Sequence, residues 1–78
     1  MNLIEKVRYT SAQAAEAKST AESAATRVVQ AATPIEKYIW KQYAHAAEEH
    51  LEATEYAAQA AIWRLENIKI KIMALFSE

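Results

Sequence analysis

The sequence predicts an all-α protein: one antiparallel hairpin domain, residues 1–78, with helices at about 3–32 and 34–76. The composition includes no Gly, Cys or Asp and a single Pro, which disfavours tight turns and favours helix. Apolar residues recur every three or four positions on both sides of Pro34. The two apolar rows are out of phase by two residues, which matches neither a stutter nor a stammer of one continuous helix.

The first predicted helix carries a seam of small residues. Asn2 and Glu5 resemble a capping box at its start, with Asn in the place that Ser or Thr usually holds. Small residues bury little area each, but they let two helix axes approach closely, and Ala is the strongest helix former. This small-residue seam consists of Leu3, Val7, Thr10, Ala14, Ala17, Ala21, Ala24, Val28 and Ala31.

The segment 33–36 predicts that the second helix begins at Pro34. Thr33 is suited to cap the helix, Pro34 lacks an N–H where the first turn leaves one unbonded, and Glu36 can reach back to the cap. A single rod kinked at Pro34 is the alternative, favoured by the missing Gly at the end of the first helix. The phase difference and the short connection favour the hairpin.

The second predicted helix carries an apolar seam that is unbroken over five heptads. Its spacing alternates between four and three residues, so its side chains share one face of a helix. In a hairpin, Leu3 then lies near Leu65, and Lys18 lies near His50. This long seam consists of Trp40, Ala44, Ala47, Leu51, Thr54, Ala58, Ala61, Leu65, Ile68, Ile72 and Leu75.

Beyond residue 66 the second helix has no partner in its own chain. This overhang, residues 67–76, is nevertheless the most apolar part of the sequence. Ile and Lys alternate within it as they do in a strand, but the long seam continues to Leu75, which favours helix. An exposed apolar cluster of this kind indicates association, and another copy of the chain is the simplest partner.

A second apolar row lies on the side of the second helix away from the long seam. Tyr56, Trp63 and Ile70 stand at seven-residue spacing in it, and exposed aromatic residues favour an interface. This Trp63 row consists of Ala53, Tyr56, Ala60, Trp63, Ile70 and Ala74, interrupted by Asn67. The predicted interface residues are Tyr56, Trp63, Ile68, Ile70, Ile72, Met73, Leu75 and Phe76.

The two apolar surfaces predict a non-enzymatic structural protein that self-associates through the overhang and the Trp63 row. A short hairpin buries little surface, so oligomers are expected, either a dimeric four-helix bundle or a ring, tube or filament. The alternative is a small adaptor or inhibitor that binds an unrelated protein through the same apolar face or through an acidic patch. In outline, with a Pro near the turn, the chain resembles the helical-hairpin subunits of type III secretion needles; this resemblance of architecture implies no site residues.

One cluster in the second helix has the residue types of a metal site. His45 and Glu49 are four residues apart, but di-iron bundles use the opposite order, Glu-x-x-His. We therefore predict no metal and interpret the cluster as a solvated acidic patch that a basic surface could contact. Lys18 of the first helix could offset part of its charge. The acidic patch consists of Glu48, Glu49, Glu52 and Glu55.

Other functions find little support in the sequence. Nine basic and ten acidic residues provide no positive excess for nucleic acid, and no catalytic or cofactor motif is present, so no enzyme activity and no cofactor are predicted. Residues 62–76 have the ingredients of a membrane-surface helix, but three bases offset by Glu66 make the lipid attraction small. The charged N-terminus does not resemble a signal peptide, and no membrane span is predicted. Cytoplasmic synthesis is expected, with leaderless export left open.

Overall fold

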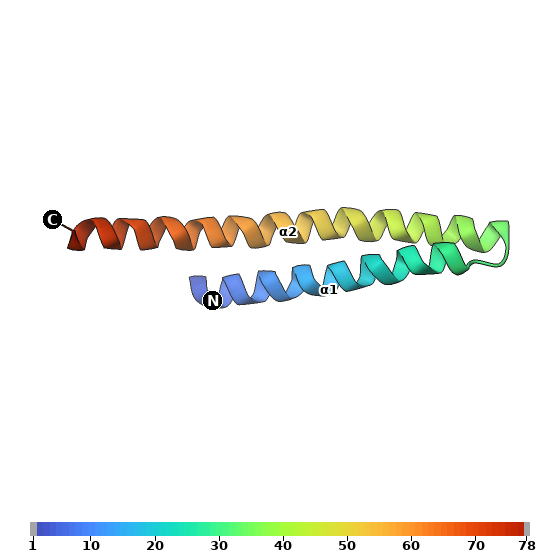
Figure 1. The fold of residues 1–78 in the computed structure, drawn as a ribbon, viewed down its shortest axis with the longest axis horizontal. Helices are drawn as coiled ribbons and strands as arrows, with labels where there is room; N and C mark the ends of the chain where they lie inside the picture. The colour runs from blue at the N-terminus through green and yellow to red at the C-terminus, as the bar shows by residue number, and fades with distance from the viewer. Residues whose placement is uncertain (1, 78) are drawn as a thin grey trace.

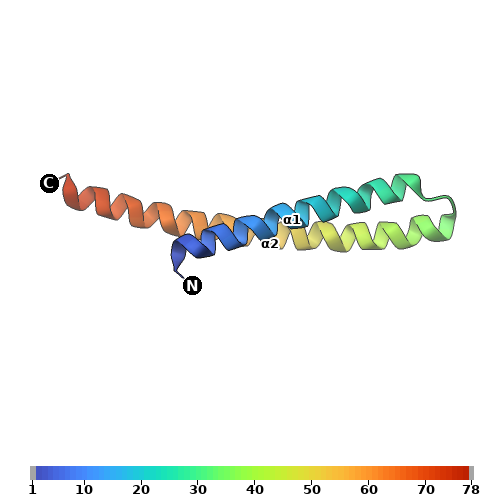
Figure 2. The same ribbon diagram turned by 90° about the horizontal axis from the view of Figure 1, so that it is seen from below.

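Two helices make up the fold of this protein in a computed structural model that describes residues 2–77. Helix α1 spans Leu3–Gln30 and helix α2 spans Pro34–Phe76. The helices run antiparallel and side by side, and α2 extends well past the start of α1 (Figure 1). In the view turned by 90°, the N-terminal half of α1 crosses over α2 (Figure 2). The predicted all-α hairpin is confirmed, and the kinked rod is excluded.

The start of α1 has the predicted cap. Asn2 has an extended backbone, and its Oδ1 accepts a hydrogen bond from the backbone N–H of Glu5 at 2.8 Å. The carboxylate of Glu5 accepts in return from the side-chain amide of Asn2, at 3.3 Å. The two residues therefore satisfy each other through their side chains, whereas in the usual capping box the Glu bonds to the backbone of the cap residue.

The turn between the helices is held by Thr33 and Glu36. The Oγ1 atom of Thr33 accepts from the backbone N–H of Glu36 at 3.1 Å, as the sequence predicts. Helix α1 ends at Gln30, two residues before the predicted end, and its C-cap residue Ala31 already has an extended backbone. Pro34 lacks the N–H that would bond to the carbonyl of Gln30 and disfavours helix at Thr33, so no helix continues through the turn. The freed N–H of Ala32 donates to the Glu36 carboxylate at 3.2 Å. The Glu36 carboxylate therefore bonds to the N–H of Ala32, one residue before the Thr33 N–H that a capping box would use.

The core between the helices consists of the two predicted seams. Every residue of the small-residue seam is buried or half-buried, and all other described residues of α1 are exposed. The long seam is buried or half-buried from Trp40 to Leu65. Nearly all of the deeply buried side chains are alanines, so the core excludes water through close approach of the helices. The deeply buried residues are Thr10, Ala17, Ala21, Ala24, Ala58 and Ala61.

Thr10 is the polar member of this core, and its hydroxyl is satisfied within its own helix. The Oγ1 atom donates to the backbone carbonyl of Lys6 at 2.8 Å and lies 3.2 Å from that of Val7. On α2, the half-buried Thr54 donates in the same way to the carbonyl of Leu51, at 2.9 Å. Because these bonds pair each hydroxyl locally, Thr occupies the seam without an unpaired buried polar group.

Larger side chains close the hairpin near the turn. The guanidinium of Arg27 lies 5.3 Å from the centroid of the Trp40 ring, in cation–π geometry, and Tyr43 meets the same ring edge-on at 5.7 Å. The predicted register places Arg27 opposite Lys41, so the observed contact differs from it by one residue. The pairing of the helices was therefore correctly predicted to within one residue at this end.

The hairpin is a thin rod. It measures 67 × 18 × 14 Å, with a radius of gyration of 18.5 Å, whereas a compact domain of this length has about 11.5 Å. Its accessible surface of 6330 Å² exceeds the roughly 4,800 Å² expected for a compact protein of this mass. A single chain thus buries an unusually small share of its apolar side chains.

Candidate functional site

The overhang of α2 projects beyond the start of α1 as a single helix (Figure 1). Long-seam residues up to Leu65 are covered by α1, whereas Ile68 and Ile72 at the next two seam positions are 46% and 48% exposed. Exposure rises toward the tip and reaches 87% at Phe76. The seam itself continues without a break, and only its covering helix ends. The overhang is therefore an uncovered continuation of the hairpin core.

An open groove lies along this uncovered part of the seam. It has a volume of about 360 Å³. Its walls are mainly apolar, and the stems of charged side chains complete them, as is common for long amphipathic residues. The residues that line it are Leu65, Glu66, Ile68, Lys69, Ile72 and Met73. The groove begins at the last covered seam residue, so it connects directly with the interface between α1 and α2.

The Trp63 row forms a second uncovered surface on α2. Tyr56, Trp63 and Ile70 are 75%, 60% and 61% exposed, although these residue types bury large area when a partner is present. The alanines of the row are also exposed, except for the half-buried Ala60. The structure places the predicted interface residues along α2 from Tyr56 to Phe76, on its two apolar surfaces, and leaves all eight of them exposed. Their role as an interface stays a prediction.

The acidic patch lies on α2 and overlaps in sequence with the start of the Trp63 row. All four of its glutamates are exposed. His45 Nε2 lies 3.0 Å from Glu49 Oε1, which is the single contact of a basic with an acidic side chain within salt-bridge distance among residues 2–77, and both side chains are well exposed. Among residues 2–77, no salt bridge joins Lys18 to the acidic patch. A patch of like charges on an open helix face repels a second copy of itself.

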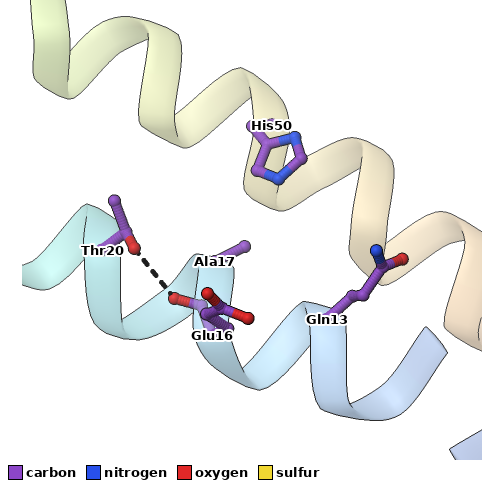
Figure 3. Close-up of a pocket in the computed structure, with 5 residues that line it drawn as sticks. All are labelled: Gln13, Glu16, Ala17, Thr20 and His50. Carbon is purple, nitrogen blue, oxygen red and sulfur yellow. Dashed lines mark hydrogen bonds between the residues drawn. The ribbon is translucent and has the colours of Figure 1, made fainter. Parts of the chain in front are cut away.

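The residues opposite the acidic patch line a polar depression between the helices. Its volume is about 230 Å³, and the ring of His50 points from α2 toward α1 above Ala17 (Figure 3). Thr20 donates to the backbone carbonyl of Glu16 at 3.1 Å beside it. Ala17, and not the predicted partner Lys18, lines this depression with His50, so the pairing differs here from the predicted one by one residue. Gln13 completes the lining.

A third exposed apolar surface was missed in the sequence. Ile35, Tyr38 and Ile39 are exposed at the turn end of α2, and Val29 is exposed at the end of α1. We name these four residues the turn-end patch. The spacing of Ile35, Tyr38 and Ile39, three and four residues, is a helical-face signal. These residues fall outside the long seam, which begins at Trp40, so the seam does not include them.

Within residues 2–77, the structure holds no group of three or more His, Cys, Asp or Glu side chains arranged to bind a metal ion. Neither helix, over the same residues, combines the length and apolar content that crossing a membrane requires. Comparison of the chain with protein-family models, with curated proteins and with solved structures finds no match. The exposed surfaces of α2 are the features of this chain that indicate a function.

Proposed function

We propose that this chain is a non-enzymatic structural protein whose function is self-assembly, with a second copy covering the overhang and the Trp63 row. The observation that carries the proposal is the long seam, which is covered as far as Leu65 and continues uncovered through Ile68 and Ile72. A seam that buries one helix along its covered part is suited to bury another along the rest. The continuity of the groove with the hairpin core supports a helix as the occupant.

The thin core of the hairpin also supports association. The buried side chains are small, and none of the large apolar residues within residues 2–77 is deeply buried. Chains of this size rarely gain enough stability from such a core alone, and oligomerisation is one usual remedy. Two separate apolar surfaces on one subunit permit a closed dimer or, if unlike surfaces pair, an open-ended assembly. A net charge of −1 offers little repulsion between copies.

Size-exclusion chromatography with light scattering tests the proposal on the purified chain. We expect a dimer or a larger species at tens of micromolar. The double substitution Trp63→Glu with Ile70→Glu places two charges in the Trp63 row, where burial against a partner is costly, and should shift the chain to monomer. Ile68→Glu with Ile72→Glu tests the groove of the overhang in the same way.

A matched control separates the surface from the added charge. Ala12→Glu with Ala25→Glu adds two charges to exposed positions of α1 and should leave the assembly unchanged. A folded monomer of the unmodified chain at the same concentration would overturn the proposal and leave binding of an unrelated protein as the interpretation. If the Trp63 and Ile70 variant loses helical circular dichroism together with assembly, folding and association are one event, which agrees with self-assembly.

A further inference from the structure

We infer that two copies of the chain pair in parallel and in register along the Trp63 row, as a second coiled coil on the outer side of α2. The inference rests on the proposed self-assembly and specifies the geometry of one of its two contacts, the one along the Trp63 row. The row repeats with spacings of three and four residues over residues 53–74, about three heptads, and none of its described members has a partner in the hairpin except the half-buried Ala60.

Heptad positions assign the roles in this second seam. The members that precede a three-residue step occupy position a, and the members that follow it occupy position d. Position a holds Ala53, Ala60, Asn67 and Ala74, and position d holds Tyr56, Trp63 and Ile70. The small residues at a bring the helices close, and the large residues at d supply the buried area. Asn67, which interrupts the apolar row, occupies one of the a positions.

Asn67 is the first indication of a parallel pair. A single Asn at position a costs stability but specifies register and oligomer state in parallel coiled coils, because it faces the same Asn of the partner and the two side chains can pair. Asn67 is exposed on α2, where a second copy can reach it. Register in this seam therefore has a specific determinant.

The charges beside the seam are the second indication. Glu66 lies at position g on one edge, and Lys71 lies at position e on the other, both exposed. In a parallel pair, each g residue faces the e residue five positions later in the partner, so Glu66 meets Lys71 of the second copy twice by symmetry. Gln59 meets Arg64 in the same way. In an antiparallel pair that overlaps along the whole seam each edge faces itself, so Glu66 would meet Gln59 and would lose the contact with Lys71.

The seam also has a defined end. The next position d toward the turn is Glu49, and a parallel pair would set this carboxylate against its own copy. The contact therefore stops at Ala53, and Glu48 and Glu49 of the acidic patch lie outside it. In the resulting dimer both turns lie at one end, and the two overhangs lie side by side at the other.

Disulfide trapping tests the orientation, since the natural chain has no Cys. Ala53→Cys and Ala74→Cys mark the two ends of the seam, about 32 Å apart along the helix. In the parallel, in-register dimer each variant should form a disulfide with itself under mild oxidation, and a mixture of the two should yield no mixed dimer. The exposed Ala12→Cys on α1 is the control and should stay uncrosslinked.

Charge exchange provides a second readout. Lys71→Glu should weaken dimerisation about three- to tenfold, because two partly exposed ion pairs are lost, and adding Glu66→Lys should restore it. If the chain dimerises but neither Cys variant joins to itself, or if mixed disulfides dominate, the parallel arrangement is wrong while self-assembly stands. If light scattering finds only monomer, the proposed function itself fails, and this inference fails with it.

Discussion

At the residue scale, local side-chain chemistry determines where each helix begins. Asn2 and Thr33 both accept from the N–H three residues later, and in both cases the following Glu takes a second bond. These contacts involve neighbours in sequence, so they could be anticipated without knowledge of the packing. The bond from the Ala32 N–H to Glu36 could not be anticipated, because it depends on where α1 ends.

The cap that Thr33 provides for α2 contributes measurably to the unfolding free energy. Thr33→Ala removes the acceptor for the Glu36 N–H and should lower the unfolding free energy by about 1 kcal/mol. Thermal melts followed by circular dichroism at fixed protein concentration measure the loss. The control Thr26→Ala removes a hydroxyl that bonds only to the carbonyl of Glu22 inside α1, and should leave stability equal or slightly higher. Equal melting of the two variants would show that the cap contributes nothing.

At the element scale, the small-residue seam sets how closely α1 and α2 pack. Ala24 is 1% exposed and faces the core, whereas the adjacent Ala25 faces solvent. A side chain larger than Ala has no room at such a position unless the helices separate. The alanine content of α1 therefore has a packing role on one face and only a helix-forming role on the other.

Substitution of these neighbours separates the two roles. Ala24→Leu should destabilise the hairpin by about 1–3 kcal/mol through overpacking. Ala25→Leu makes the same chemical change on the exposed face and should alter stability little, because Leu is nearly as good a helix former. Urea denaturation of both variants provides the comparison. A fully tolerated Leu at position 24 would contradict close packing there.

At the scale of the whole molecule, the unequal lengths of the helices create the exposed surface. Helix α1 has 28 residues and α2 has 43, so the longer helix necessarily projects from one end of an antiparallel pair. The projecting part carries the densest run of large apolar residues. Self-assembly as proposed would bury it and would add stability that a single hairpin lacks.

Association of this kind makes stability depend on concentration. If the native chain assembles and the unfolded chain does not, the melting temperature should rise over a roughly hundredfold increase in protein concentration, by mass action. The Trp63→Glu, Ile70→Glu variant should instead melt at one temperature throughout. Circular dichroism melts of both chains test this. A concentration-independent melt of the unmodified chain would mean that no assembly stabilises the fold.

The sequence by itself determined the two helices, the start of each, the two seams and the register to within one residue. It could do so because caps and periodicity depend on neighbours along one chain. The same periodicity and the unequal helix lengths suggested the eight interface residues, whose role as an interface stays a prediction. The structure alone decided that α1 ends at Gln30, that Glu36 bonds to Ala32 and that the turn-end patch is exposed. Those features depend on where a second helix stops in space, which periodicity along one helix does not encode.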